Sequence, residues 1–259
     1  MRIAVLGAGA FGTALGNILV KNGHEVVYYD PKITDVKLED VLDGAEVMVL
    51  AVPSGVVQDI LPYLPTNKTL IVATKGVLTP EPFEKFENWM VLSGPGFAGD
   101  IEKGKSTKLT ATSEEIIKLF STDYLKFDST TDKKGVLMCG ALKNVYAILA
   151  GILDLRPGAS EHEKFLRDVT KEMGLILAMN GADEKTVNLA CGEGDLRITC
   201  YYPSRNYEFG QILRDNPEAI PEKTVEGVPA LKRIREGEIL VPENAVILRD
   251  LIRRSEQWA

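Results

Sequence analysis

Short apolar runs recur through the first half of the chain and alternate with polar or amphipathic stretches. Continuous apolar runs are typical of strands buried on both faces, and their alternation with helical segments predicts a doubly wound parallel sheet. The predicted strands are residues 2–6, 24–29, 47–52, 69–73 and 90–92, with 108–111 and 125–127 as short further candidates. The predicted helices are residues 13–20, 55–64, 82–88 and 113–121, the last with Ser113 as its N-cap.

The pattern changes near residue 132. Residues 133–153 are apolar with helical spacing, and residues 161–180 have helical spacing with one polar face. Residues 216–229 are predicted to form a loop, and no strand-like run of comparable strength follows Phe127. The sequence therefore predicts an α/β domain over residues 1–130 and an all-α domain over residues 131–259.

Three spaced glycines follow the first predicted strand directly, in Gly-Ala-Gly-Ala-Phe-Gly over residues 7–12. In such a strand–loop–helix unit, Gly7 allows a tight turn, Gly9 lets the backbone approach a pyrophosphate, and Gly12 lets the helix pack on the strand. The phosphates would lie on unpaired amides at the helix N-terminus. The first domain is therefore predicted to be a dinucleotide-binding Rossmann domain. The alternative is that the glycines only close a tight turn.

Asp30 ends the second predicted strand, 18 residues after Gly12. An acceptor for the adenosine ribose hydroxyls is expected about 20 residues after the glycines. A carboxylate there would repel the 2′-phosphate of NADP, so we expect NAD as the cofactor, with NADP less favoured.

The net charge and the lengths of the apolar stretches argue against two classes of partner, nucleic acids and membranes. The formal net charge of -7 argues against a broad nucleic-acid-binding surface, and no uninterrupted apolar stretch is long enough to predict membrane insertion. The glycines argue against a signal peptide at the start of the chain. Three cysteines without paired spacing indicate reduced thiols of a cytoplasmic protein, and with only two histidines a metal site is not expected. His24 is predicted at a strand start, and His162 on a solvated helix face.

Two stretches that end predicted strands carry candidate chemistry. Lys75 is expected to face the cofactor crevice, because ligands of an open parallel sheet collect at the carboxyl ends of its strands. Alternatively, it is a solvated surface lysine. Residues 93–98, Ser-Gly-Pro-Gly-Phe-Ala, either present backbone amides to an anion or form only a turn.

The second domain places a lysine inside an apolar helix. Lys143 either reaches water along its aliphatic stem or is a partly buried ammonium whose pKa desolvation lowers toward neutrality. A lysine of the second kind can exchange a proton with a substrate hydroxyl as hydride leaves the same carbon. Asp195 could hold this ammonium in place. Ser204, Arg205 and Asn206 suit a terminal phosphate at a helix N-terminus, or else form a capped helix with an exposed arginine.

Seven ordered motifs join these stretches: Gly-Ala-Gly-Ala-Phe-Gly-Thr-Ala-Leu, Ala-Thr-Lys-Gly, Ser-Gly-Pro-x-Phe-Ala, Ala-Leu-Lys-Asn-Val, Gly-Asp-Leu-x-x-Thr-Cys, Ser-Arg-Asn-x-x-Phe-Gly and Val-Glu-Gly. From Met1 to about Pro242 the chain thereby resembles the NAD(P)-dependent sn-glycerol-3-phosphate dehydrogenases of the bacterial type. The resemblance implies an N-terminal Rossmann domain, a helical C-terminal domain and an active site between them. It also implies interconversion of glycerol 3-phosphate and dihydroxyacetone phosphate.

The resemblance adds roles for individual residues to those argued above. Lys143 is implied as the proton acceptor, and Asp195 as its catalytic neighbour. The candidate substrate-binding residues are Lys75, Gly94, Gly96, Asn144, Thr199, Ser204, Arg205 and Asn206. The candidate cofactor-binding residues are Gly7, Gly9, Ala10, Phe11, Gly12, Asp30, Lys75, Ala98, Arg205 and Glu226.

The chain departs from the family pattern in several places. It is shorter than usual, with a short connection between Asp30 and Val47, and Gly96 replaces a Ser or Thr whose hydroxyl would line the substrate pocket. Residues 160–173 are more charged than in the family, and Glu193 adds a negative charge beside Asp195 that could alter the titration of Lys143. We therefore expect substrate affinity to differ from that of the family.

The sequence leads to the hypothesis of an NAD-dependent glycerol-3-phosphate dehydrogenase that acts on a small phosphorylated substrate at the entry to lipid biosynthesis. A homodimer is common in enzymes that this chain resembles. Two alternatives stay open: a related dehydrogenase of another phosphorylated polyol or hydroxy acid, and a catalytically inactive NAD-binding sensor.

Overall fold

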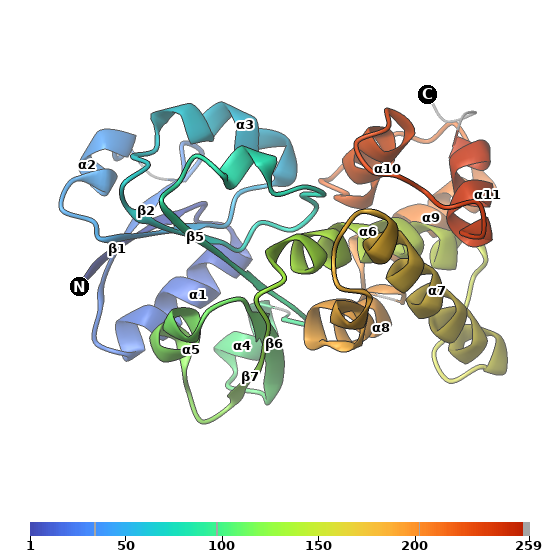
Figure 1. Cartoon of the computed structure of the whole chain (residues 1–259), viewed down its shortest axis with the longest axis horizontal. Coiled ribbons are helices and arrows are strands. Elements are labelled where there is room, and N and C mark those ends of the chain that lie inside the picture. Colours follow the sequence, from blue (N-terminus) through green and yellow to red (C-terminus); the bar gives the residue numbers. More distant parts are fainter. Residues whose placement is uncertain (34, 97, 202, 256–259) are drawn as a thin grey trace. The chain divides into compact units, whose positions relative to one another are not determined.

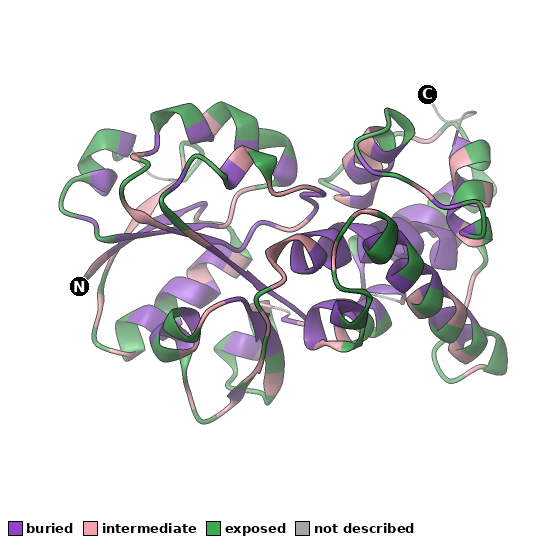
Figure 2. Ribbon diagram, in the orientation of Figure 1, coloured by how far each residue is buried: buried purple, intermediate pink, exposed green. Residues whose placement is uncertain are grey.

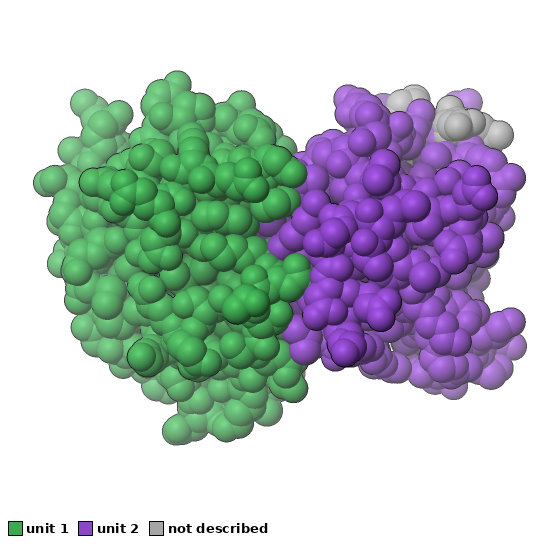
Figure 3. Space-filling view, viewed as in Figure 1, with its two compact units in different colours: residues 1–75, 80–133 green, residues 76–79, 134–259 purple. Residues whose placement is uncertain are grey.

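The computed structural model describes residues 1–33, 35–96, 98–201 and 203–255. The chain forms two compact units, which Figure 3 shows in different colours. Unit 1 comprises Met1–Lys75 and Pro80–Lys133, and unit 2 comprises Gly76–Thr79 and Lys134–Ala259. The short segment that follows Lys75 therefore belongs with the C-terminal half of the chain.

Unit 1 is built on a seven-stranded sheet in the order β2-β1-β3-β4-β5-β6-β7. The first five strands pair in parallel, β6 is antiparallel to β5, and β7 is parallel to β6. The strand order reverses at β1, and ligands of such sheets bind at the carboxyl ends of the strands beside this switch point. The predicted doubly wound sheet is confirmed, except that the antiparallel pair was not foreseen. The strands are β1 (Arg2–Leu6), β2 (Glu25–Tyr29), β3 (Val47–Leu50), β4 (Thr69–Val72), β5 (Asn88–Ser93), β6 (Thr107–Ala111) and β7 (Leu125–Ser129).

Helices cover both faces of this sheet (Figure 1). They are α1 (Ala10–Lys21), α2 (Leu38–Leu42), α3 (Val57–Ile60), α4 (Ala98–Glu102) and α5 (Glu114–Phe120), with 3-10 turns η1 (Ser54–Val56), η2 (Leu61–Tyr63) and η3 (Glu81–Phe83). As predicted, Ser113 caps α5, because its hydroxyl oxygen accepts a hydrogen bond from the Glu115 amide at 3.1 Å.

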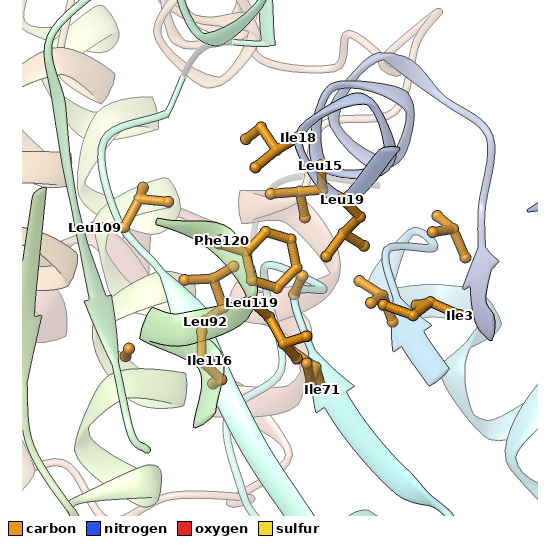
Figure 4. Packing of buried hydrophobic residues seen from close by; sticks show 14 of the residues in the cluster. Ile3, Leu15, Ile18, Leu19, Ile71, Leu92, Leu109, Ile116, Leu119 and Phe120 are labelled. Carbon is orange, nitrogen blue, oxygen red and sulfur yellow. The ribbon is translucent and has the colours of Figure 1, made fainter. Parts of the chain in front are cut away.

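The main apolar core of unit 1 lies under α1 and α5. Leu15 and Leu19 of α1 belong to the same buried cluster as Phe120 of α5 and Ile3 of β1 (Figure 4). Each of these side chains is fully buried, which contributes about 1.5–3 kcal/mol per large aliphatic residue. This packing fixes α1, and with it the loop that precedes α1, on the sheet.

Two predicted crossover helices of unit 1 are wrong in part. Residues 55–64 form η1, α3 and η2 in succession, with Pro62 in the first turn of η2. Residues 82–88 contain only the end of η3, and β5 begins already at Asn88. Phe83 and Phe86 are both buried, a spacing that one tight turn satisfies without a longer helix.

Among the described residues of unit 2, the regular secondary structure is helical, as predicted. Its helices are α6 (Lys133–Ile152), which starts at the last residue of unit 1, α7 (Ser160–Met179), α8 (Asp195–Thr199), α9 (Arg205–Asp215), α10 (Gly227–Arg235) and α11 (Val246–Ser255). A 3-10 turn η4 (Glu184–Asn188) and a π-helical turn η5 (Ala190–Gly194) precede α8.

Helix α6 is buried along nearly its whole length (Figure 2). By length and composition it could cross a membrane, but 94% of its most apolar window is buried inside the structure. Its burial on all sides makes it a core helix around which the other helices pack. Helix α10 starts close against it, because a Cβ on Gly227 would lie 2.6 Å from the Asn144 carbonyl oxygen. The loop predicted over residues 216–229 therefore ends earlier than expected, at the start of α10.

A buried carboxylate joins α6, α7 and α11. Glu172 of α7 accepts hydrogen bonds from the Tyr146 hydroxyl at 2.7 Å and from the amides of Ile247 and Leu248 at 2.9 and 2.7 Å. These amides lie in the first turn of α11, where amides lack partners within the helix. Burial and the neighbouring Glu172 raise the pKa of Tyr146 well above its usual value. The C-terminal helix is thereby tied to the core of unit 2.

The prediction that His162 lies on a solvated face of its helix is wrong. His162 is only 2% exposed. His162 is spaced three, four and seven residues from the buried Phe165, Leu166 and Val169, so it lies on the apolar face of α7.

Candidate active site

The glycine loop of unit 1 joins β1 to α1. Gly7 has a φ of 102°, and a Cβ there would lie 2.6 Å from the Ala51 carbonyl oxygen. A Cβ on Gly12 would overlap the Gly7 carbonyl oxygen. Gly9 is different, because no described heavy atom outside Gly9 and its two chain neighbours lies within 4 Å of the position its Cβ would take. The first and third glycines thus close the turn, and the second leaves open space at the N-terminus of α1, beside Ala10 and Phe11.

Asp30 ties the glycine loop to the end of β2. Its Oδ2 accepts a hydrogen bond from the Ala8 amide at 3.1 Å, and its Oδ1 accepts one from the Lys32 amide at 3.0 Å. Both oxygens of the Asp30 carboxylate thus accept hydrogen bonds from the backbone at this end of β2. Asp30 therefore stands beside the glycine loop, as a ribose acceptor must, and also stabilises the loop itself.

Lys75, Gly94 and Phe11 come together at the carboxyl ends of β4 and β5. The Lys75 ammonium donates to the Gly94 carbonyl oxygen at 3.1 Å and lies 5.1 Å from the centre of the Phe11 ring. Contact with a ring face favours a cation. Lys75 is therefore held at the carboxyl ends of the strands and is half-buried, so it is not the fully solvated surface lysine of the alternative interpretation.

Gly94 and Gly96 form a tight loop before α4. Gly94 has a φ of 140°, and its carbonyl oxygen also accepts the Gly96 amide at 2.8 Å. A Cβ on Gly96 would lie 3.1 Å from Cδ1 of Ile101 and 3.5 Å from Cε2 of Phe11. A Cβ at this position would press against Ile101 and lie in ordinary contact with Phe11. Ala98 is the first residue of α4, and Phe97 lies outside the described residues.

Lys143 and Asp195 form a buried ion pair in unit 2. The Lys143 Nζ lies 2.6 Å from the Asp195 Oδ1, and their side chains are 3% and 1% exposed. Nζ also donates to the Thr199 hydroxyl at 3.2 Å, while that hydroxyl donates to the Asp195 carbonyl oxygen at 2.6 Å. Asp195 and Thr199 lie one turn apart on α8, so both reach the same ammonium. The interpretation that Lys143 extends to water is therefore wrong.

The charges of this pair act on the thiol of Cys200, the residue that follows α8. Burial raises the pKa of Cys200 strongly, with the Asp195 carboxylate acting in the same direction and the Lys143 ammonium against it. Glu193, which the sequence places beside Asp195, is directed toward the surface, where it lies 3.7 Å from Arg197.

Two asparagines connect α6, α9 and α10. Asn206 Nδ2 donates to the Asn144 Oδ1 at 3.0 Å, and its Oδ1 accepts the Gly227 amide at 2.9 Å. Asn144 in turn donates to the Gly140 carbonyl oxygen at 3.1 Å. The start of α10, next to Glu226, is thus fixed relative to Lys143, the neighbour of Asn144.

Arg205 is the first residue of α9, and its side chain is exposed. Ser204 is buried at the N-cap position but makes no capping hydrogen bond through its side chain. The prediction that Ser204 stands at the helix start is right, whereas the expected side-chain cap is not formed. The first amides of a helix lack partners within the helix, so this end of α9 is suited to an anion.

The structure groups the predicted residues into two sets, one in each unit. The set in unit 1 comprises Gly7, Gly9, Ala10, Phe11, Gly12, Asp30, Lys75, Gly94, Gly96 and Ala98. The set in unit 2 comprises Lys143, Asn144, Asp195, Thr199, Ser204, Arg205, Asn206 and Glu226. One residue connected to the second set was missed: His162 bonds to the backbone at the end of α8. Its place in the apolar spacing of α7 could have shown that it is buried.

Comparisons with known proteins identify the family. Residues 2–36 match the family model described as NAD-dependent glycerol-3-phosphate dehydrogenase N-terminus, and residues 132–242 match the corresponding C-terminus. The chain is 31% identical to a glycerol-3-phosphate dehydrogenase (NAD(P)+) of Thermotoga sp. strain RQ2, with both chains covered completely. It is also 31% identical to the Halorhodospira halophila protein of the same name, over 82% of this chain and 77% of the relative.

A solved structure shows the same fold. The glycerol-3-phosphate dehydrogenase from Coxiella burnetii aligns with a TM-score of 0.81 at 22% identity, covering 99% of this chain and 97% of that one.

Proposed function

Because this chain belongs to the NAD-dependent glycerol-3-phosphate dehydrogenase family, we propose that it interconverts sn-glycerol 3-phosphate and dihydroxyacetone phosphate with a nicotinamide cofactor. The single observation that best supports this chemistry is the buried pair of Lys143 and Asp195. A charged lysine inside an apolar helix is costly, and buried charges are usually paired or functional. The reaction that we propose uses this lysine for proton transfer.

The residues of unit 1 fit a dinucleotide. The open space at Gly9 and the amide-bearing start of α1 suit a pyrophosphate, while the Asp30 carboxylate suits the ribose hydroxyls. We propose NAD as the preferred cofactor, since Asp30 would repel a 2′-phosphate. The residues that would hold the cofactor are Gly7, Gly9, Ala10, Phe11, Gly12, Asp30, Lys75 and Ala98 from unit 1, with Arg205 and Glu226 from unit 2.

When bound, the nicotinamide accepts or supplies the hydride at C2 of the substrate. In the oxidation of glycerol 3-phosphate, the unprotonated Lys143 amine takes the proton of the C2 hydroxyl. In the reduction, the Lys143 ammonium returns this proton to the carbonyl oxygen. Asp195, 2.6 Å from Nζ, stabilises the ammonium and orients it, and the Thr199 hydroxyl accepts one of its hydrogens.

The phosphate end of the substrate requires fixed positive charge and amide donors. Arg205 lies exposed at the first residue of an eleven-residue helix, where its guanidinium can pair with two phosphate oxygens. We assign Arg205, Ser204 and Asn206 to the phosphate, and Lys75, Gly94, Gly96, Asn144 and Thr199 to the rest of the substrate. Asn206 donates one amide hydrogen to Asn144, so it has its second amide hydrogen to offer to a phosphate oxygen.

The family membership also supports two broader proposals. The protein acts in the cytoplasm, where its product supplies lipid biosynthesis, and it forms a homodimer. Light scattering of the purified chain would measure its mass directly, and a monomer mass at assay concentration would exclude the dimer.

The reaction is tested by the loss of reduced-nicotinamide absorbance with dihydroxyacetone phosphate, using NADH and NADPH in parallel. Lys143→Ala should abolish most turnover and leave NADH binding nearly unchanged. Lys134→Ala, a lysine on the same helix, is the matched control and should retain turnover. Loss of NADH binding in Lys143→Ala would contradict the proposed role of this lysine.

The same assay separates the alternatives. Turnover of other ketones without a requirement for phosphate would favour a related dehydrogenase. NADH binding without turnover of any ketone would favour a nucleotide-binding sensor.

A further inference from the structure

Helix α8 carries two of the groups that surround the Lys143 ammonium, yet it is only five residues long. An isolated helix of this length is unstable, because nucleation costs more than so few hydrogen bonds return. The π-helical turn η5 precedes it directly and provides no regular helix to extend. The positions of Asp195 and Thr199 therefore depend on contacts between α8 and its neighbours.

One such contact comes from His162 on α7. Its Nε2 lies 3.2 Å from the carbonyl oxygen of Cys200, the C-cap residue of α8. A carbonyl oxygen can only accept, so Nε2 carries the hydrogen and donates it. Both residues are almost fully buried. The last carbonyl groups of a helix lack donors within the helix, and His162 supplies one at the end of α8.

A second contact also joins α7 to α8. Arg197 donates to both oxygens of the Glu163 carboxylate, at 2.8 and 3.0 Å, and both side chains are partly exposed. Exposed pairs of this kind contribute little stability. The buried contact of His162 is different, because the Cys200 carbonyl would have no access to water if the imidazole were lost. Of these two contacts, the one made by His162 is therefore the stronger.

We propose that His162 is a positioning residue for the reaction, acting on Lys143 through α8. By holding the Cys200 carbonyl, it keeps Asp195 and Thr199 within reach of the ammonium that carries the substrate proton. This inference rests on the proposed function for its catalytic consequence, but its structural part concerns α8 alone. In this proposal His162 itself touches neither the substrate nor the cofactor.

Two amide variants test the proposal. His162→Gln places a donor nitrogen where Nε2 stands, whereas the shorter side chain of His162→Asn ends near the position of Nδ1. Both variants introduce the same chemical group, so they differ mainly in reach. Arg197→Met serves as the control, because it removes the exposed contact on the same helix.

Two readouts are needed. In NADH oxidation with dihydroxyacetone phosphate, His162→Asn should lower kcat by about 10- to 100-fold, since small displacements of reacting groups have effects of this size. NADH affinity should change by less than about twofold. His162→Gln should stay within about threefold of the unmodified protein, and Arg197→Met likewise.

The second readout does not depend on activity. Cys200 is fully buried, so alkylation at this thiol, located by peptide mass spectrometry, reports opening of α8. His162→Asn should raise its alkylation rate at least about tenfold, and His162→Gln should not. Equal rates and equal kcat in the two amide variants would overturn the proposal. If the unmodified protein does not oxidise NADH, the proposed function fails, and the alkylation rates alone decide whether His162 holds α8.

Discussion

The buried ion pair of Lys143 and Asp195 leads to a quantitative prediction about the free energy of unfolding. Asp195→Asn removes the carboxylate charge and keeps the size of the side chain. The Lys143 ammonium, whose side chain is 3% exposed, is then left without its counter-charge inside unit 2. Breaking one partner of a buried pair costs about 3–5 kcal/mol. We expect a loss near 3 kcal/mol, because the Asn oxygen can still accept a hydrogen bond from Nζ.

Lys143→Met should cost a similar amount, because it leaves the Asp195 carboxylate buried without its cation. The double variant Lys143→Met/Asp195→Asn contains neither charge, so it should be more stable than the sum of the two single changes predicts. We expect a coupling energy of about 2–3 kcal/mol between the two positions, at the upper end for residues in contact. The thioether fills the volume of the lysine stem, which keeps the cavity term small.

Urea denaturation followed by circular dichroism measures this cycle. The far-ultraviolet signal reports mainly the helical unit 2, where both residues lie. With a slope of about 2 kcal/mol per molar urea, a loss of 3 kcal/mol lowers the midpoint by about 1.5 M. Additive effects of the two single changes would refute the reasoning, because they would mean that the two charges do not stabilise one another in solution.

Further predictions address the other parts of the site. Gly9→Ala should fold normally and lose NADH binding. Gly12→Ala should lose NADH binding and also be destabilised, because its methyl group would overlap the Gly7 carbonyl oxygen. The melting temperature and an NADH titration distinguish the two variants. Asp30→Ala should shift the ratio of NADPH to NADH turnover toward NADPH by about tenfold or more, as judged by the two kcat/KM values, and an unchanged ratio would exclude Asp30 as the ribose acceptor. Arg205→Met should chiefly raise the KM for dihydroxyacetone phosphate, by about 10- to 100-fold, and a normal KM would remove Arg205 from the phosphate site. Finally, burial raises the pKa of the Cys200 thiol above its ordinary value of 9.0. The unfolded chain therefore loses this proton at lower pH than the folded chain. The contribution of the thiol to the free energy of unfolding is fully present below pH 9 and is lost as the pH rises above it. The loss should be about 1 kcal/mol between pH 9 and pH 10, and urea titrations should find it absent in Cys200→Ala.

Much of the fold follows from local patterns. The apolar runs predict the strands of unit 1 because a strand buried on both faces needs apolar residues at every position. The glycine loop predicts its own turn, since only glycine tolerates a φ of 102° at Gly7 and the close approach at Gly12. The helix predicted over residues 82–88 was wrong, because helical spacing over few residues also suits a single turn that buries two phenylalanines.

The sequence by itself indicated candidates for the site. Glycine spacing, a carboxylate at the end of a strand and a lysine within an apolar helix are local properties, and the family motifs added the other candidates. The sequence could not decide whether Lys143 reaches water or is buried, since that depends on what packs beside α6. Asp195 was already a sequence-based candidate for holding this ammonium, and the tertiary structure confirms the pair. Only the tertiary structure adds the Thr199 hydroxyl to it and shows that His162 contacts the end of α8. The physical reason is that a buried charge is tolerated only where another element supplies its counter-charge and hydrogen bonds, and the identity of that element is a property of packing.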